Sequence, residues 1–126
     1  MSYCFDNDRP IYIQLLEKIK IDIVSEKIKP GEKVFSVREL ALLYKVNPNT
    51  VQKSLEKLEE EALIYTERTN GKFVTEDKKL IAKVKEEFAR EKVNKYLIDM
   101  QKLGFDFEDA VKYLNELGGK NGTVRI

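Results

Sequence analysis

Apolar side chains recur at helical spacing near the start of the chain. They return every four positions from Ile11 to Ile19, directly after Pro10, a residue that suits the first turn of a helix. The run ends where residues 29–31 (Lys-Pro-Gly) force a turn. The pattern therefore predicts a first helix over residues 10–27, preceded by an irregular leader.

Two shorter helices are expected next, separated by a break of only a few residues. Ser36 and Glu39 form a capping-box pair, in which each side chain accepts from the other's backbone amide, so a helix should begin at Val37. It should end near residues 45–46. Residues 47–48 (Asn-Pro) are a favoured N-cap and a favoured first helical residue, which predicts a third helix directly afterwards.

A β-hairpin is expected after the third helix. Residues 63–66 and 73–75 have the composition of short strands, and residues 69–71 (Thr-Asn-Gly) lie between them. Asn-Gly is a strong signal for a tight turn because both residues tolerate positive φ. Two closely linked helices followed by a hairpin indicate a winged helix-turn-helix, whose second helix enters the DNA major groove.

The charge pattern changes near residue 76. Lysines and glutamates then alternate around apolar residues at spacings of three and four, which predicts one long helix to about residue 103. Gly104 should end it, and Asp106 should cap a last helix before a mobile tail from residue 120. The predicted fold is mostly α with a small β-hairpin: a DNA-binding domain over residues 1–75 and a helical dimerisation segment over residues 76–126.

The last two helices have an apolar face that one copy would leave partly exposed to water. A second copy related by two-fold symmetry would cover it, so we expect a homodimer. The residues expected at the dimer interface are Val84, Phe88, Val93, Tyr96, Leu97, Met100 and Leu114.

Composition excludes several classes of function. There is no histidine and a single cysteine, Cys4, so an internal disulfide is excluded, the usual zinc ligands are missing, and the commonest general base is absent. We therefore expect neither an enzyme nor a metal or cofactor site. The absence of a long apolar stretch or a secretion signal predicts a cytoplasmic protein.

The overall charge neither supports nor excludes DNA binding. The net charge is +1, and twelve basic and twelve acidic residues cancel within residues 1–75. A DNA-binding surface would therefore have to be locally basic. The N-terminus of the third helix would add free amides and a partial positive charge that attract phosphate.

Several short strings occur in a characteristic order along the first part of the chain. They are Pro10-Ile11-Tyr12-x-Gln14, Lys29-Pro30-Gly31-Glu32-Lys33, Ser36-Val37-Arg38-Glu39-Leu40-Ala41, Val46-Asn47-Pro48-Asn49-Thr50-Val51, Leu58-Glu59 through Leu63-Ile64, and Gly71-Lys72-Phe73-Val74. Together they resemble the GntR family of transcription regulators over about residues 10–75. The short C-terminal segment resembles the YtrA-type branch of that family.

The resemblance implies a homodimeric repressor bound to double-stranded DNA at a two-fold symmetric operator. It places the recognition helix in the major groove and the tip of the wing in the minor groove. The residues that match the family's DNA contacts are Ser36, Arg38, Asn47, Asn49, Thr50, Gln52 and Gly71.

The chemistry of these side chains agrees with DNA contact. Arg38 can bind a phosphate or a guanine edge, and Gln52 and Asn49 offer the donor and acceptor pair that adenine requires. Thr50 can contact a phosphate or a thymine methyl group. For Asn47 a helix-capping role and a DNA contact are both open. Lys53, Arg68 and Lys72 are further candidates for phosphate contact, because we expect them to lie near the DNA groove.

The chain departs from the family pattern at two places. Val34-Phe35 stands where the family commonly has Leu-Pro, and residues 68–72 (Arg-Thr-Asn-Gly-Lys) replace the usual Arg-Gly-x-Gly-Thr of the wing. Two other readings stay open. One is a protein-interaction module without DNA specificity, which the balanced charge of residues 1–75 suggests. The other is a sensor for a small-molecule effector, for which no binding motif is visible.

Overall fold

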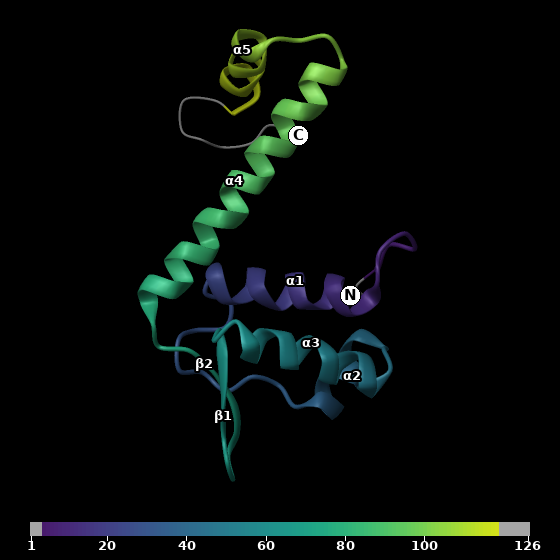
Figure 1. Cartoon of the computed structure of the whole chain (residues 1–126), viewed down its shortest axis with the longest axis vertical. Coiled ribbons are helices and arrows are strands. Elements are labelled where there is room, and N and C mark those ends of the chain that lie inside the picture. The colour runs from purple at the N-terminus through teal and green to yellow at the C-terminus, as the bar shows by residue number, and fades with distance from the viewer. Residues whose placement is uncertain (1–3, 119–126) are drawn as a thin grey trace. The chain divides into compact units, whose positions relative to one another are not determined.

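The computed structural model describes residues 4–118 as a mostly helical chain with one antiparallel hairpin, which confirms the expected fold class (Figure 1). The elements in order are α1 (Ile11–Val24), α2 (Val37–Tyr44), α3 (Pro48–Glu60), β1 (Ile64–Glu67), β2 (Gly71–Val74), α4 (Lys78–Lys102) and α5 (Phe107–Gly118). The chain divides into two compact units between Lys85 and Glu86. The first unit thus includes the first turns of α4, beyond the boundary expected at residue 76.

The core of the first unit is built around α3. Helix α1 packs against α3, and α2 and β1 also contact α3. Helices α1 and α3 and the two strands contribute side chains with almost no exposed surface, because their apolar residues repeat at the period of the helix or strand. These side chains are Leu15, Ile19 and Ile23 from α1, Val51, Leu55 and Leu58 from α3, Leu63 and Ile64 at β1, and Val74 from β2.

Helix α1 ends at Val24, three residues before the end that the sequence predicted. Glu26 takes a positive φ of 62°, and the backbone N–H of Ile28 donates to the carbonyl oxygen of Asp22 at 3.0 Å. This turn bends the chain out of the helix before Pro30 is reached, so the proline does not end the helix.

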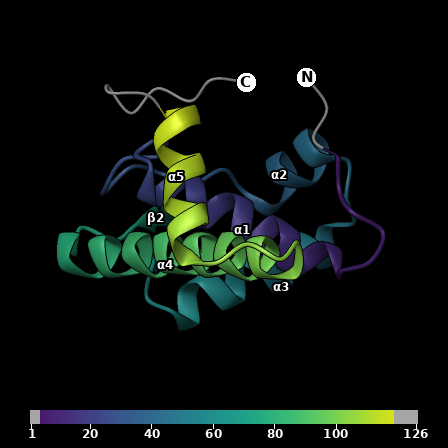
Figure 2. The ribbon, with the colours of Figure 1, turned by 90° about the horizontal axis from the view of Figure 1, so that it is seen from above.

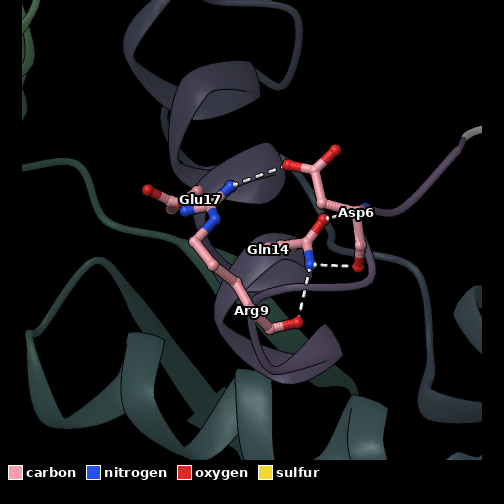
Figure 3. Close-up of polar contacts among 4 residues, drawn as sticks. All are labelled: Asp6, Arg9, Gln14 and Glu17. Carbon is pink, nitrogen blue, oxygen red and sulfur yellow. Dashed lines mark hydrogen bonds and ion pairs between the residues drawn. The ribbon is translucent and has the colours of Figure 1, made fainter.

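Residues 6–9, which precede α1, are held in place by one buried polar side chain. The side-chain oxygen of Gln14 accepts from the backbone N–H of Asp6 at 2.7 Å (Figure 3). Its amide nitrogen donates to the carbonyl oxygens of Asp6 at 3.0 Å and Arg9 at 2.8 Å. Arg9 in turn donates to Glu17 at 2.7 Å. The sequence predicted an irregular leader but not that α1 ties it down.

Replacing Gln14 with alanine should lower the free energy of unfolding by about 1–2 kcal/mol, because three hydrogen bonds of a buried amide are lost together. Urea unfolding followed by circular dichroism measures the change. Gln101→Ala is the matched control, since Gln101 is an exposed glutamine of α4. Equal stability of the two variants would contradict a structural role for Gln14.

A segment between α1 and α2 extends the hairpin by a third extended stretch. The backbone N–H of Gly31 donates to Val74 O at 2.9 Å, that of Val74 to Glu32 O at 2.9 Å, and that of Val34 to Lys72 O at 2.8 Å. Lys33 lies opposite Phe73 in this pairing. The sequence predicted only a turn here, because four residues are too few to show a strand pattern.

The second unit contains the rest of α4 and the shorter α5, which runs in a different direction (Figure 2). The hydroxyl of Tyr96 donates to the carbonyl oxygen of Ala110 at 2.7 Å and joins the two helices. Asp106 caps α5 as expected, because its carboxylate accepts from the N–H of Asp109 at 2.9 Å. The tail expected to be mobile from residue 120 lies outside the described residues.

Among the described residues, no helix is both long enough and apolar enough to cross a membrane.

Candidate nucleic-acid interface

Helix α2 begins at a complete capping box. The N–H of Glu39 donates to the Ser36 hydroxyl at 3.1 Å, and the N–H of Ser36 donates to the Glu39 carboxylate at 2.9 Å. This confirms the predicted start at Val37 and places Arg38 in the first turn, with its side chain exposed. No ion pair involves Arg38 among the described residues, so its guanidinium remains available to a phosphate or a base.

The turn between α2 and α3 is short and strained. Helix α2 ends at Tyr44, and Lys45 takes the left-handed conformation with φ 56°. The side-chain oxygen of Asn47 then accepts from the N–H of Asn49 at 2.7 Å, and Pro48 is the first residue of α3. The capping role of Asn47 is confirmed, whereas its contact with DNA stays a prediction.

The N-terminal half of α3 presents a polar surface. Asn49, Gln52 and Lys53 are exposed and Thr50 is half-buried. The amide of Gln52 donates to Glu56 at 3.2 Å, one turn further along. Lys53 places its ammonium nitrogen 3.9 Å from the centre of the Tyr12 ring, a cation–π contact that orients the lysine near the start of the helix.

A buried serine fixes α3 against α1. The hydroxyl of Ser54 lies 2.8 Å from the carbonyl oxygen of Tyr12 in α1 and 3.2 Å from that of Thr50. Ser54 has no exposed surface. A polar residue between apolar positions gives no sign of such a partner in the sequence, so this link between α3 and α1 was not predicted.

The wing differs in detail from the expected tight turn. Glu67 pairs with Gly71, and the backbone N–H of Asn70 donates to Glu67 O at 3.2 Å. Gly71 takes a positive φ of 103°, but Asn70 does not. The hairpin expected from Asn-Gly is present, but its turn covers residues 68–70, because Gly71 already pairs with Glu67 at the start of β2. Arg68 is exposed in this turn.

Lys72 is held inside the first unit by two side chains. Its ammonium nitrogen lies 2.9 Å from the carboxylate of Glu59 in α3 and 2.8 Å from the hydroxyl of Thr66 in β1. Thr66 also donates a short hydrogen bond to Glu59. These three side chains, the wing–α3 cluster, connect the wing to the end of α3. Lys72 is half-buried, and its phosphate contact stays a prediction.

The wing–α3 cluster sets the charge state of Glu59. Hydrogen bonds from Thr66 and then from Lys72 lower the pKa of Glu59 below its ordinary value of 4.5, against the opposite effect of burial. Because the pKa of Glu59 is lower in the folded chain than in the unfolded chain, the ionised carboxylate stabilises the fold. This stabilisation is fully present at pH values above the pKa of the unfolded chain, and it is lost as the pH falls through the pKa of the folded chain.

Glu59→Gln should therefore remove part of the loss of stability in acid. Comparing urea unfolding at about pH 6 and about pH 3, we expect the wild type to lose more stability than the variant, since only the wild type has a Glu59 carboxylate to protonate. Glu60→Gln is the control, because Glu60 is exposed and pairs only at 3.4 Å with Lys57. If Glu59→Gln and the wild type lose the same stability between the two pH values, Glu59 is not responsible for the acid sensitivity.

The residues predicted to contact DNA all lie in the first unit, on three connected elements. Ser36 and Arg38 belong to the start of α2; Asn47, Asn49, Thr50, Gln52 and Lys53 belong to the start of α3; and Arg68, Gly71 and Lys72 belong to the wing. Ser36 and Gly71, far apart in the sequence, line the same surface hollow of about 370 Å³. In the described part of the chain no group of acidic, cysteine or histidine side chains could hold a metal ion.

The residues predicted at a dimer interface differ in how much surface they offer. Val93 is 55% exposed and Leu114 53% exposed, while Phe88, Tyr96, Leu97 and Met100 are half-buried. Val84 is buried within the first unit and has little surface left for a partner.

Helices α4 and α5 line an open apolar hollow of about 470 Å³ in the second unit. Its lining includes Tyr96, Met100 and Leu114, together with Leu117, which is 56% exposed. One copy therefore leaves part of this apolar surface in contact with water.

Comparisons with known proteins agree with this geometry. The family described as "Bacterial regulatory proteins, gntR family" matches residues 11–74. The HTH-type transcriptional repressor YtrA of Bacillus subtilis (strain 168) is 34% identical over 117 residues, covering 88% of this chain and 90% of the repressor.

Two solved structures extend the comparison. A GntR family transcriptional regulator from Listeria monocytogenes is 38% identical, with a TM-score of 0.83 over 89% of this chain and 98% of that one. The AraR DNA-binding domain in complex with operator ORX1 is 28% identical, with a TM-score of 0.52 over 60% of this chain and 90% of that one. The first likeness covers most of both chains and is not confined to the winged-helix region.

Proposed function

This chain belongs to the gntR family of bacterial regulatory proteins, and we propose that it is a homodimeric transcription repressor that binds a two-fold symmetric operator. Helix α3 enters the major groove and the wing approaches the minor groove. The repressor acts by occupying promoter DNA. The relatives named above support this proposal, since one is a repressor and another was solved with its operator.

The observation on which the proposal depends is the exposed polar start of α3. Asn49 and Gln52 present side-chain amides, whose paired donor and acceptor match the edge of adenine in the major groove. Lys53 on the same turns supplies a positive charge. The charges of residues 1–75 cancel overall, but Asn49 and Gln52 can form hydrogen bonds with base edges and Lys53 can attract a phosphate.

Dimerisation supports the same function. A second copy would cover the exposed apolar side chains of α4 and α5, among them Val93 and Leu114. Two-fold symmetry would then present two copies of α3 to successive major grooves, roughly 34 Å apart along the DNA.

A second candidate function is a protein-interaction module without DNA specificity. The equal numbers of acidic and basic residues in residues 1–75 favour it, because non-specific DNA binding depends on net positive charge. Such a module would show no retention on heparin or DNA at low salt.

The deciding experiment is a fluorescence-anisotropy titration of the full chain against the intergenic DNA upstream of its own gene, with a scrambled duplex as control, at low and high salt. A repressor that controls its own operon binds the upstream duplex more tightly than the scrambled one, and the affinity falls as salt rises. Equal weak binding to both duplexes, or none, would contradict autoregulation and favour the interaction module.

A further inference from the structure

A surface hollow separates the wing from the start of α2. It has a volume of about 370 Å³, and residues from three parts of the first unit line it. Ser36 forms one wall at the start of α2, and Asn70 and Gly71 form the opposite wall at the tip of the wing. Lys33 and Phe35 lie in the segment between them. We call this feature the wing hollow.

The backbone pairing of the third extended stretch puts Lys33 beside the tip of the wing. Lys33 lies opposite Phe73, and its Cε is 3.1 Å from the position that a Cβ on Gly71 would occupy. Lys33 forms no ion pair with any described residue, in contrast to Lys72, which is bound to Glu59. Lys33 is thus a lysine beside the wing that makes no direct ion pair, although its charge acts at longer range on the Glu39 carboxylate.

Phe35 adds an apolar surface to the same hollow. Its side chain is 56% exposed although its neighbour Val34 is buried in the core. More than half of the surface of this ring is therefore left in water by the chain itself. The ring can gain by covering the apolar face of a sugar ring, because removing apolar surface from water is favourable.

We propose that the wing hollow holds the sugar–phosphate backbone of one DNA strand, with Lys33 contacting a phosphate and Phe35 packing on a deoxyribose. The proposal rests on the DNA-binding function proposed above and adds two contacts that the motifs did not identify.

The position of the wing hollow favours DNA over other occupants. Its two walls contain Ser36 and Gly71, both expected at the DNA surface, so a strand that touches both must pass over the hollow. The one carboxylate in its lining, Glu39, accepts the N–H of Ser36 in the capping box, and these hydrogen bonds together with the charge of Lys33 keep its pKa below the ordinary value. A mixed apolar and cationic floor fits a sugar–phosphate chain, whose surface alternates between the two.

The test compares Lys33→Met and Phe35→Ala in the full chain on the operator duplex across a range of salt concentrations. Lys33→Met should weaken binding about five- to tenfold and reduce the slope of log affinity against log salt by about 0.9, the value for one lost phosphate contact. Phe35→Ala should weaken binding about three- to tenfold without changing that slope, because an apolar contact releases no counterion.

Matched controls exist in the first unit. Lys83→Met removes an exposed lysine of α4, and Leu42→Ala removes a 73% exposed apolar side chain of α2; neither residue lines the wing hollow. Circular dichroism establishes that each variant is folded, and Phe35→Leu replaces Phe35→Ala if the latter is not. We expect both controls to bind like the wild type.

The outcomes separate the two proposals. If the wild type binds the operator but Lys33→Met and Phe35→Ala bind as tightly as the controls, the wing hollow does not hold DNA and the repressor function stands. A weaker Lys33→Met with an unchanged salt slope would also overturn the phosphate contact. If the wild type binds no duplex, the proposed function itself fails.

Discussion

Replacing Val93 with aspartate should convert the proposed dimer into monomers and weaken operator binding about 10²- to 10⁴-fold, the gain that two linked binding sites usually provide. Val93 is 55% exposed in a single chain, so the substitution should leave the fold of each chain intact. In the proposed dimer the same side chain is covered, and a carboxylate there would be buried without a partner.

Sedimentation velocity measures the dimer fraction, and anisotropy on the same samples measures operator affinity. Asn94→Asp is the matched control, because it adds the same charge at the next position of α4 with almost no change in volume. Leu97→Asp should act like Val93→Asp. If Val93→Asp sediments as a dimer, the central part of α4 does not belong to the dimer interface.

Truncating Arg38 to alanine should cost about 1–3 kcal/mol of operator binding, or about 5- to 150-fold in affinity, if the guanidinium contacts a base edge. The capping box at Ser36 and Glu39 holds the first turn of α2, so Arg38 projects from a fixed backbone. Because its side chain is exposed, its removal should not affect folding.

The salt dependence distinguishes the two roles open to Arg38. Loss of a phosphate contact lowers the salt slope and weakens all duplexes alike, whereas loss of a base contact relaxes the preference at one operator position. Arg90→Ala is the control, since Arg90 lies in the second unit and pairs with Glu86 at 2.7 Å. Unchanged affinity in Arg38→Ala would exclude Arg38 from the DNA surface.

The elements with strong local signals were predicted closely. The start of α2 at Val37 and that of α3 at Pro48 were both identified, because their caps are formed by residues within three positions of each other. The end of α1 was misplaced, because it depends on a backbone turn at Glu26 that no residue type marks.

For the candidate site, the residue types along α3 and the order of the motifs indicated which side chains to consider. Most of those residues are exposed on connected elements, but their DNA contacts stay predictions. Lys72 shows the limit of such reasoning: its position in the wing suggested a phosphate contact, which stays a prediction, but gave no sign that the fold brings it 2.9 Å from Glu59, thirteen residues away.

The sequence by itself determined the helices, the hairpin and the family, because capping, periodicity and motif order depend on residues close together along the chain. Only the tertiary structure decided which side chains meet: Gln14 with the leader, Lys72 with Glu59, and Lys33 with the tip of the wing. These contacts depend on how separate segments pack around a common core, and packing is a property of the whole fold that no local pattern records.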